Sequence, residues 1–437
     1  MDATMANKLL IIDVAALGYD LLVRHDSTEI AGLTFHPAET VFPALTCTAQ
    51  ASFRTAGLPE KHGMVGNGLF FRDLRRPMFW EQSARLVAGK RIWSDFRRRG
   101  GKVGLLFWQQ SLGEAADLLV SPAPIHKHHG GMIQDCYSRP DGLYHHLCQE
   151  VGSPFKLQQY WGPMASYKAG DWIAQAARCV LRKGDPALDV CLLYLPTLDY
   201  DLQRAGPDGP RAAKALDSLA GQLSWLRETA DEFGYELIVF GDYAMAPVTG
   251  RPVLPNLALR QAGLLRTRSV RGMLYPDFHG SRAFAVVDHE IAHVYAAGDG
   301  DLGPAREALA ALPGVAEVLD ASDLSARGLA HPNSGDLLIL AEEGTWLAYP
   351  WWTDRKQAPE YATHVDIHNK PGYDPCELFF GWPPTTVSQD TTKVRGTHGR
   401  SGPGRRIAWA STTDLSGPPA TLLELAEAVN GMLDEQA

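Results

Sequence analysis

The feature that most constrains this chain is a series of short apolar runs separated by helical segments. Five runs have the length and composition of buried β-strands, at residues 8–13, 102–107, 189–196, 235–242 and 336–342. The clearest intervening helix is expected over 211–233, and a final helix over 421–433. Alternation of this kind predicts an α/β fold, with a doubly wound, mostly parallel sheet flanked by helices.

Three aspartates stand where such a fold binds its ligands. Asp13, Asp199 and Asp242 each close an apolar run. Ligands of open α/β sheets bind at the carboxyl ends of the strands. The sequence therefore predicts a polar site at that edge of the sheet.

The chain is long enough for one large domain, since it has 437 residues of which 45% are apolar. We interpret residues 1–437 as a single domain. Two regions break the alternation of strands and helices, at about 117–185 and about 245–390. The first is rich in loops and aromatic residues, and the second contains further strands and Pro/Gly turns. We expect both to be insertions that form a cap and shape a substrate pocket.

Composition excludes several kinds of partner. The net charge of −9 gives no electrostatic footprint for a nucleic-acid polymer. No apolar run reaches the roughly 18 to 20 residues that a membrane span needs, and no secretory signal is recognisable. The six cysteines show neither CxxC pairing nor the spacing of a disulfide framework. These observations predict a cytoplasmic protein with reduced thiols and leave its oligomeric state open.

Residues 41–71 carry the strongest chemical signal. They contain TCTAQ, in which Thr46 can begin a helix, and an HGxxGN loop that ends at Asn67. A threonine hydroxyl is a poor nucleophile at neutral pH and is activated most simply by a divalent metal. The backbone N–H groups and the dipole at a helix N-terminus would favour the charge of an attacked phosphoryl group. Alone, TCTAQ is equally consistent with an ordinary N-cap before a helix of small residues.

Together with Asp13, this segment resembles the active-site opening of the alkaline phosphatase superfamily, and most closely its nucleotide pyrophosphatase/phosphodiesterase branch. In that branch a threonine nucleophile is followed by a TGxxPExHG turn and a phosphate-binding asparagine. The resemblance places Thr46 on the nucleophile and Asn67 on the asparagine, at the family's spacing. Thr48 is the competing candidate for the nucleophile.

Three further segments resemble metal-binding motifs of this family. In PTLDYDLQRAGP (196–207), Asp199 falls on an aspartate ligand and Gln203 on a histidine ligand. In FGDYAMAP (240–247), Asp242 falls on an aspartate and Tyr243 on a histidine, and RGTHG (395–399) places His398 on the last ligand. The resemblance implies two divalent metal ions, one bound by Asp13, Thr46, Asp242 and Tyr243, and the other by Asp199, Gln203 and His398.

The two replaced histidines leave the identity and number of the metals open. Imidazole nitrogen suits zinc, whereas amide and phenol oxygens suit harder ions such as Mn²⁺, Mg²⁺ or ferric iron. The residues at 203 and 243 are therefore compatible with two oxygen-bound metals, with one metal, or with a degenerate scaffold. The other motif residues are intact, which favours an active enzyme with Mn, Zn, Mg or Fe.

The motif HEIAH at 289–293 matches HExxH, which on a helix binds the zinc of a metallopeptidase. Here it lies in an alternating, β-branched stretch that predicts a strand, and no third zinc ligand follows at the usual spacing. On a strand, His289 and His293 would share one face, as supplementary metal ligands or as a structural pair. His368 is a further candidate for a supplementary ligand.

A GYDP segment at 372–375 resembles the GYD that follows a histidine ligand in nucleotide pyrophosphatases, but Pro371 occupies the ligand position. Lys370 and Tyr373, beside this proline, could bind an anionic leaving group. A solvated turn is the alternative for either residue alone.

The resemblance implies a metal-dependent hydrolase of a small phosphorylated metabolite or nucleotide. Thr46 would attack a phosphodiester or pyrophosphate and form a phosphothreonine intermediate, while Asn67 holds the developing oxyanion. A diester is favoured over a monoester because no arginine stands beside Thr46. The alternatives are a phosphonate or other ester hydrolase of the same superfamily, and a non-catalytic metabolite-binding protein on the same scaffold.

Overall fold

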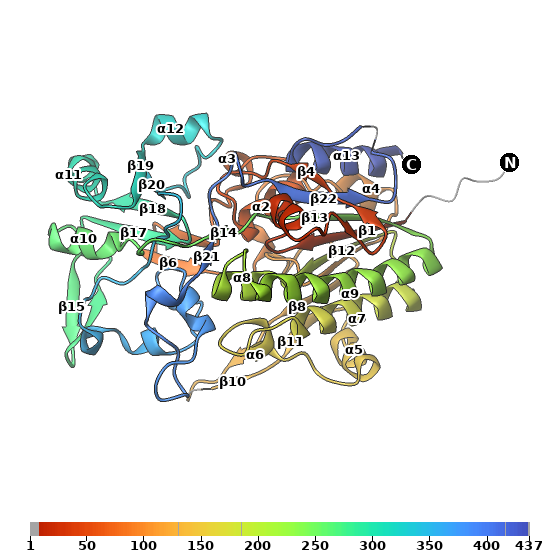
Figure 1. Ribbon diagram of the computed structural model, residues 1–437, viewed down its shortest axis with the longest axis horizontal. Helices are drawn as coiled ribbons and strands as arrows, with labels where there is room; N and C mark the ends of the chain where they lie inside the picture. The colour runs from red at the N-terminus through yellow and green to blue at the C-terminus, as the bar shows by residue number, and fades with distance from the viewer. Residues whose placement is uncertain (1–7, 130, 185, 416, 436–437) are drawn as a thin grey trace.

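The computed structural model describes residues 8–129, 131–184, 186–415 and 417–435, and its centre is an eight-stranded sheet (Figure 1). Five adjacent strands run parallel, and the strand pairs at both edges of the sheet are antiparallel. The predicted doubly wound, mostly parallel sheet is therefore confirmed. In order across the sheet, the strands are β11 (Cys136–Arg139), β8 (Leu118–Pro122), β7 (Val103–Leu106), β12 (Val190–Leu195), β1 (Lys8–Val14), β13 (Tyr235–Gly241), β22 (Ile407–Ser411) and β4 (His36–Ala38).

The central strands are apolar along their whole length because helices cover both of their faces. Every residue of β12 is buried, and every residue of β1 after Lys8. On one face the sheet packs against α7 (Lys168–Lys183), α8 (Asp199–Ala205) and α9 (Pro210–Phe233). On the other face it packs against α2 (Thr46–Thr55), α4 (Ser94–Arg98) and α13 (Leu422–Glu435) (Figure 1).

Helices α9 and α13 confirm the two helices predicted from periodicity. Leu219, Leu223 and Leu226 recur at helical spacing on α9, and all three are fully buried against the sheet. The helix begins with Pro210 at its first position, where the missing N–H costs nothing, and ends at Gly234 with φ 72°.

A second sheet lies at the end of the molecule opposite the C-terminus (Figure 1). It is four-stranded and antiparallel, in the order β17 (Ala283–Asp288), β18 (Ile291–Ala296), β20 (Leu337–Ala341) and β19 (Val315–Leu319). The helices α10 (Pro255–Gln261), α11 (Asp299–Ala310) and α12 (Ala321–Ala326) lie in the same part of the chain. The prediction that 336–342 forms a parallel strand is thus wrong. A short buried apolar run does not specify the direction of its neighbours.

The first predicted insertion is largely part of the central layer. Of residues 117–185, β8 and β11 are strands of the central sheet, and α7 covers one of its faces. The second predicted insertion, 245–390, contains all of the four-stranded sheet and the helices α10, α11 and α12. The remaining helices and strands are α1 (Tyr19–Arg24), β2 (Glu29–Ile30), β3 (Leu33–Thr34), α3 (Pro59–His62), β5 (Gly68–Phe71), β6 (Arg76–Phe79), β9 (Ile125–His126), β10 (Met132–Ile133), α5 (Leu143–Val151), α6 (Leu157–Tyr160), β14 (Ala246–Pro247), β15 (Thr267–Val270), β16 (Met273–Pro276) and β21 (Gly396–Thr397).

Two sequence observations can be compared directly with the structure. All six cysteines lie in the described part of the chain, and none of them is paired in a disulfide there. Among the described residues, no helix combines the length and the apolarity needed to cross a bilayer.

Candidate functional site

The site lies at the carboxyl edge of the three central strands. Asp13 is the second-last residue of β1, Asp242 directly follows β13, and Asp199 begins α8 just after β12. All three carboxyl groups are buried, with exposed fractions of 0%, 0% and 7%. The three predicted acidic residues are thus found at the edge where parallel sheets bind ligands.

Thr46 is the first residue of α2 and follows Leu45, whose backbone is extended. Its side chain is buried and lines the main cavity of the molecule. The hydroxyl lies close enough to Asp242 to oppose the rise in the pKa of that carboxyl group. Thr48 is also buried but does not line the cavity, and its hydroxyl has no partner among the described residues. The geometry therefore favours Thr46 over Thr48 as the group that can meet a substrate.

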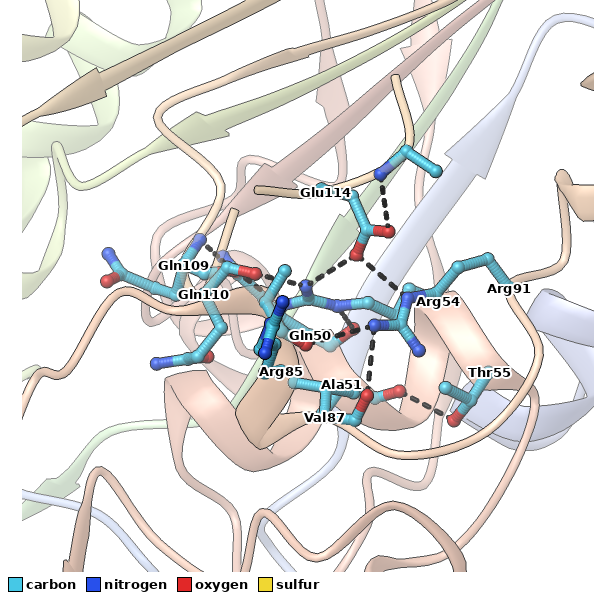
Figure 2. A network of polar contacts seen from close by, with 12 residues as sticks. Gln50, Ala51, Arg54, Thr55, Arg85, Val87, Arg91, Gln109, Gln110 and Glu114 are labelled. Carbon is cyan, nitrogen blue, oxygen red and sulfur yellow. Dashed lines mark hydrogen bonds and ion pairs between the residues drawn. The ribbon is translucent and has the colours of Figure 1, made fainter. Parts of the chain in front are cut away.

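A buried polar network fixes α2 beneath the site (Figure 2). The Arg54 guanidinium donates to the backbone oxygens of Gln109, at 2.5 Å, and Gln110, at 2.8 Å, and lies 3.6 Å from the Glu114 carboxylate. Gln50, one turn earlier, accepts from the Gln109 backbone N–H at 2.8 Å and donates to Asp13 Oδ2 at 2.7 Å. The helix that begins with Thr46 therefore also orients Asp13.

Asp13 and Asp242 each keep one carboxyl oxygen without a partner. Asp13 Oδ1 and Asp242 Oδ2 are buried and accept no hydrogen bond from the part of the chain that the structure describes. Burial raises the pKa of Asp13 to about 8 and that of Asp242 well above its ordinary value, and the charge of Asp13 adds to the latter. Two buried carboxyl groups with free oxygens, beside a hydroxyl, form a set of hard oxygen ligands. These residues fit one divalent cation.

Asn67 is held by a residue that the sequence analysis missed. Asp288 accepts from the Asn67 backbone N–H at 2.7 Å and from its side-chain Nδ2 at 3.2 Å. Asn67 Oδ1 accepts from the Cys47 backbone N–H at 3.0 Å, so the amide lies against the first turn of α2. Asp288 closes the apolar run AFAVVD, the same signal that identified the other three aspartates. Burial raises its pKa to about 6, and the Asn67 donors oppose that rise.

The HEIAH segment is neither a helix nor one continuous strand. His289 and Glu290 form the tight turn between β17 and β18, with Asp288 paired to Ile291 and His289 in the left-handed region at φ 62°, and Ile291 to His293 begin β18. The metallopeptidase arrangement is therefore not formed. Glu290 is buried and ion-paired with Arg405 at 2.8 Å, which leaves it no role as a general base.

The two histidines of HEIAH have different positions, contrary to the prediction that they share one face. His293 is buried in the second sheet, where Nε2 donates to the Val65 oxygen and Nδ1 accepts from the Gly335 N–H, both at 3.0 Å. His289 lines the cavity, with Nδ1 2.8 Å from Asp288 and a buried Nε2 that has no partner among the described residues. Only His289 is placed to act near the site.

The predicted second metal site is filled by hydrogen bonds. The Tyr243 hydroxyl donates to Asp199 Oδ1 and Gln203 Nε2 donates to Asp199 Oδ2, each at 2.7 Å. Gln203 Oε1 in turn accepts from the Tyr373 hydroxyl at 2.8 Å. Burial raises the pKa of Tyr243 well above its ordinary value, so its side chain is a phenol rather than a phenolate. In this arrangement Gln203 and Tyr243 do not fit the role of metal ligands.

We call Asp13, Thr46 and Asp242 the first half of the site, and Asp199, Gln203 and Tyr243 the second half. His398 contacts a residue of the second half and the segment that precedes Thr46. Its ring stacks on Tyr243 with 3.4 Å between centroids, and its Nδ1 is 2.8 Å from the Ala44 backbone oxygen. In the part of the chain that the structure describes, no three His, Cys, Asp or Glu side chains converge as a ready-made metal site. A cation in the first half would therefore depend on the Thr46 hydroxyl and on solvent for its remaining ligands.

The remaining predicted residues are divided between the cavity and the core. Lys370 is buried, with its ammonium 2.7 Å from both Asp374 and Glu377, and it does not line the main cavity. An anion-binding role for Lys370 thus has no geometric support. His368 lines the cavity wall, and its Nδ1 contacts the Phe79 backbone oxygen at 3.0 Å.

The cavity in front of Thr46 holds about 1200 Å³ of empty space, including the part open to solvent. Segments 121–161 and 365–373 contribute much of its wall, so both regions predicted to shape a pocket do line it. No lysine or arginine is found among the described lining residues. The aromatic side chains of the wall are Trp80, Phe107, Tyr160, Trp161, Tyr194, Tyr200, Tyr243 and Tyr373.

Comparison with known proteins gives one family and several structures. Residues 28–374 match the model of the type I phosphodiesterase / nucleotide pyrophosphatase family. Phosphonoacetate hydrolase from Sinorhizobium meliloti 1021, solved with phosphonoformate, has a TM-score of 0.64 at 15% identity over 99% of this chain and 96% of that one. Human ectonucleotide pyrophosphatase / phosphodiesterase 5 has a TM-score of 0.61 at 14% identity, over 98% of this chain and 95% of that one. The murine protein of the same name has a TM-score of 0.58 at 14% identity, with the same coverage. A comparison with curated protein sequences finds no match. At these identities the structural similarities show a shared fold.

Proposed function

The chain belongs to the type I phosphodiesterase / nucleotide pyrophosphatase family of the alkaline phosphatase superfamily, and from this premise we propose that it is a metal-dependent hydrolase with Thr46 as its nucleophile. Its substrate would be a small phosphodiester or pyrophosphate. The observation that carries this proposal is the position of Thr46. It begins α2, lines the cavity, and lies beside a buried carboxyl group whose Oδ2 is free.

Each group in the first half has a part in the reaction. Thr46 Oγ1 forms a bond to phosphorus while the bond to the leaving oxygen breaks, which gives a phosphothreonine that water then hydrolyses. A divalent cation bound by Asp13, Thr46 and Asp242 would supply positive charge that favours the deprotonated hydroxyl. Asn67 and the N-terminus of α2 donate to the phosphoryl oxygens as their charge grows.

Asn67 can donate to a phosphoryl oxygen because its amide group carries two N–H donors. Asp288 accepts one of them, at 3.2 Å from Nδ2, and thereby fixes the plane of the amide. The second donor remains for a substrate oxygen on the cavity side, which Asn67 lines. Asp288 is thus a positioning residue in this proposal.

The cavity wall favours an ester with one negative charge and an apolar or aromatic group. A polyphosphate chain or a small polyanion would need cationic side chains around it, and the described wall has none. Aromatic rings such as Trp80, Tyr160 and Trp161 instead offer flat apolar surface. For the same reason the phosphonate alternative has less support, although a phosphonoacetate hydrolase shares the fold.

A panel of substrates tests this proposal. The metal-loaded protein should hydrolyse a bis-aryl phosphodiester faster than the aryl monoester, a nucleoside triphosphate or phosphonoacetate. Release of the phenol from the two aryl esters, and of phosphate or pyrophosphate from the other two substrates, would be followed with Mg²⁺, Mn²⁺ and Zn²⁺ in turn. Faster cleavage of phosphonoacetate would favour the phosphonate alternative. Binding of a diester without turnover under all three metals would identify a non-catalytic binding protein.

A further inference from the structure

The two halves of the site differ in what their buried oxygens do. In the first half, Asp13 Oδ1 and Asp242 Oδ2 accept nothing from the described residues. In the second half, both oxygens of Asp199 already accept hydrogen bonds at 2.7 Å, from Tyr243 and from Gln203. Each Asp199 oxygen has a second lone pair, but a cation bound there would share the oxygen with a donor hydrogen whose positive charge repels it. The first half is open to a cation, whereas the second half is closed by its own donors.

The side chains that replace the two histidines cannot simply turn to become ligands. The side-chain nitrogen of Gln203 has no lone pair to offer a metal, and its oxygen accepts from the Tyr373 hydroxyl at 2.8 Å. The Tyr243 hydroxyl carries its proton toward Asp199. The Gln203 and Tyr243 side-chain oxygens, which could have been metal ligands, are therefore already part of a hydrogen-bonded chain. This chain runs from Tyr373 through Gln203 and Asp199 to Tyr243.

A stack of four rings holds both tyrosines in place. Tyr243 lies on His398 with centroids 3.4 Å apart and planes within 3°, and His398 lies 3.7 Å from His289. The His289 ring is in turn 3.7 Å from that of Tyr373. Each of these rings belongs to a buried side chain. Neither hydroxyl can leave its partner without a break in the stack.

From these contacts we propose that the protein binds a single divalent cation, at Asp13, Thr46 and Asp242. The hydrogen-bonded chain of Tyr373, Gln203, Asp199 and Tyr243 takes the place of a second one. This inference rests on the proposed function for the first cation. The carboxyl group of Asp199 is then stabilised by two neutral donors, the Tyr243 hydroxyl and the Gln203 amide, rather than by a cation.

Metal stoichiometry tests this directly, without reference to activity. The chelated protein is titrated with Mn²⁺ by calorimetry, and the dialysed product is examined by elemental analysis. We expect one equivalent per chain for the wild type. Two matched variants test which half of the site binds the cation, because each replaces one buried carboxyl group by an amide of equal size. Asp13→Asn should lose the bound Mn²⁺, whereas Asp199→Asn should keep it.

A second pair of variants tests whether the residues at 203 and 243 prevent the binding of a second cation. The double variant Gln203→His/Tyr243→His supplies two imidazoles, and we expect it to bind a second equivalent, of Zn²⁺ in preference to Mn²⁺. The control Gln203→Leu/Tyr243→Phe removes the same hydrogen bonds without adding ligands and should remain at one equivalent. Circular dichroism would establish that each variant is folded.

The outcomes separate this inference from the proposed function. Two equivalents in the wild type, or equal loss in Asp13→Asn and Asp199→Asn, would overturn the single-cation site while leaving a metal-dependent hydrolase intact. No bound metal in the wild type would overturn both. The wild-type measurement decides between these cases even if a variant fails to fold.

Discussion

At the scale of single residues, Thr46 and Thr48 differ in what their hydroxyl groups face. Thr46 lines the cavity beside Asp242, whereas Thr48 lies two residues further along α2 and has no partner among the described residues. Residues two positions apart in an α-helix point to nearly opposite sides, because each residue is rotated by about 100° around the axis. Thr46 and Thr48 therefore cannot both face one substrate. The nucleophile can therefore be assigned by a pair of variants.

Thr46→Ala should abolish turnover and leave the fold intact. Loss of a nucleophile costs several orders of magnitude in kcat, whereas loss of one buried hydroxyl costs about 1 kcal/mol of unfolding free energy. Steady-state kinetics with a bis-aryl phosphodiester and urea denaturation measure the two effects. Thr48→Ala is the matched control and should keep kcat. A wild-type rate in Thr46→Ala would contradict the assignment.

We expect Asp288 to make the rate of hydrolysis depend on pH. Burial raises its pKa to about 6, and only the ionised carboxylate can accept both Asn67 donors. The ionised form dominates above that pKa, so we expect kcat/KM to fall as the pH drops through about 6. Asp288→Asn cannot accept both bonds at any pH, so it should lower kcat and remove this limb of the profile. An unchanged limb in the variant would assign it to another group.

At the scale of elements, α2 is held in place because a loop accepts hydrogen bonds from its buried charged side chain, Arg54. Arg54 donates to two backbone oxygens after β7, and burial lowers its pKa to about 10, which still leaves it charged at neutral pH. Glu114, which faces it, is shared with Arg91 at 2.8 Å (Figure 2). The helix that carries Thr46 is thus tied to the sheet by polar contacts as well as by apolar packing.

Arg54→Met should therefore weaken both stability and catalysis. The change leaves Glu114 and two carbonyl groups buried without Arg54, at a cost of about 3 kcal/mol of unfolding free energy. The kcat should also fall, because α2 sets the positions of Thr46 and Gln50. Urea denaturation and kinetics on the same preparation measure both quantities. Arg91→Met, which removes the more exposed partner of Glu114, should cost less.

Glu290, in the turn between β17 and β18, has a structural role. Glu290→Gln should keep the rate of diester hydrolysis within about tenfold, since no general base is lost. It should also lower the unfolding free energy by about 3 kcal/mol, because Arg405 keeps its buried charge with a neutral partner. A large loss of rate in a stable variant would contradict this role.

At the scale of the whole molecule, a cation would join elements that are far apart in the sequence. Asp13 lies near the end of β1, Thr46 begins α2 and Asp242 follows β13. Asp13 and Asp242 are both buried, and the charge of Asp13 raises the pKa of Asp242. Bound metal should thus stabilise the entire central layer rather than a local loop.

Thermal unfolding checks this expectation. Addition of Mn²⁺ at a hundredfold excess over its Kd should stabilise the chelated protein by about 2.7 kcal/mol and raise its Tm by a few degrees. Asp13→Asn should lose this shift, because one ligand of the cation is gone. An equal shift in the variant would place the binding elsewhere.

The sequence by itself determined the fold class and the approximate position of the site. Continuous apolar runs predict strands covered on both faces, and a polar residue that closes such a run marks its carboxyl end. All five predicted strands, of which four are parallel strands of the central sheet, both helices and the edge carrying Asp13, Asp199 and Asp242 follow from this local pattern. Asp288 carries the same signal and could have been found in the same way.

Only the tertiary structure decided the contacts between side chains that are distant in the sequence. It placed 336–342 in a second, antiparallel sheet, made the first two residues of HEIAH a turn, and buried Lys370 between two carboxylates. It also joined Tyr373, Gln203, Asp199 and Tyr243 by hydrogen bonds where the motifs implied metal ligands. A motif specifies which atoms are available, but the partners that occupy those atoms depend on elements brought together only by folding.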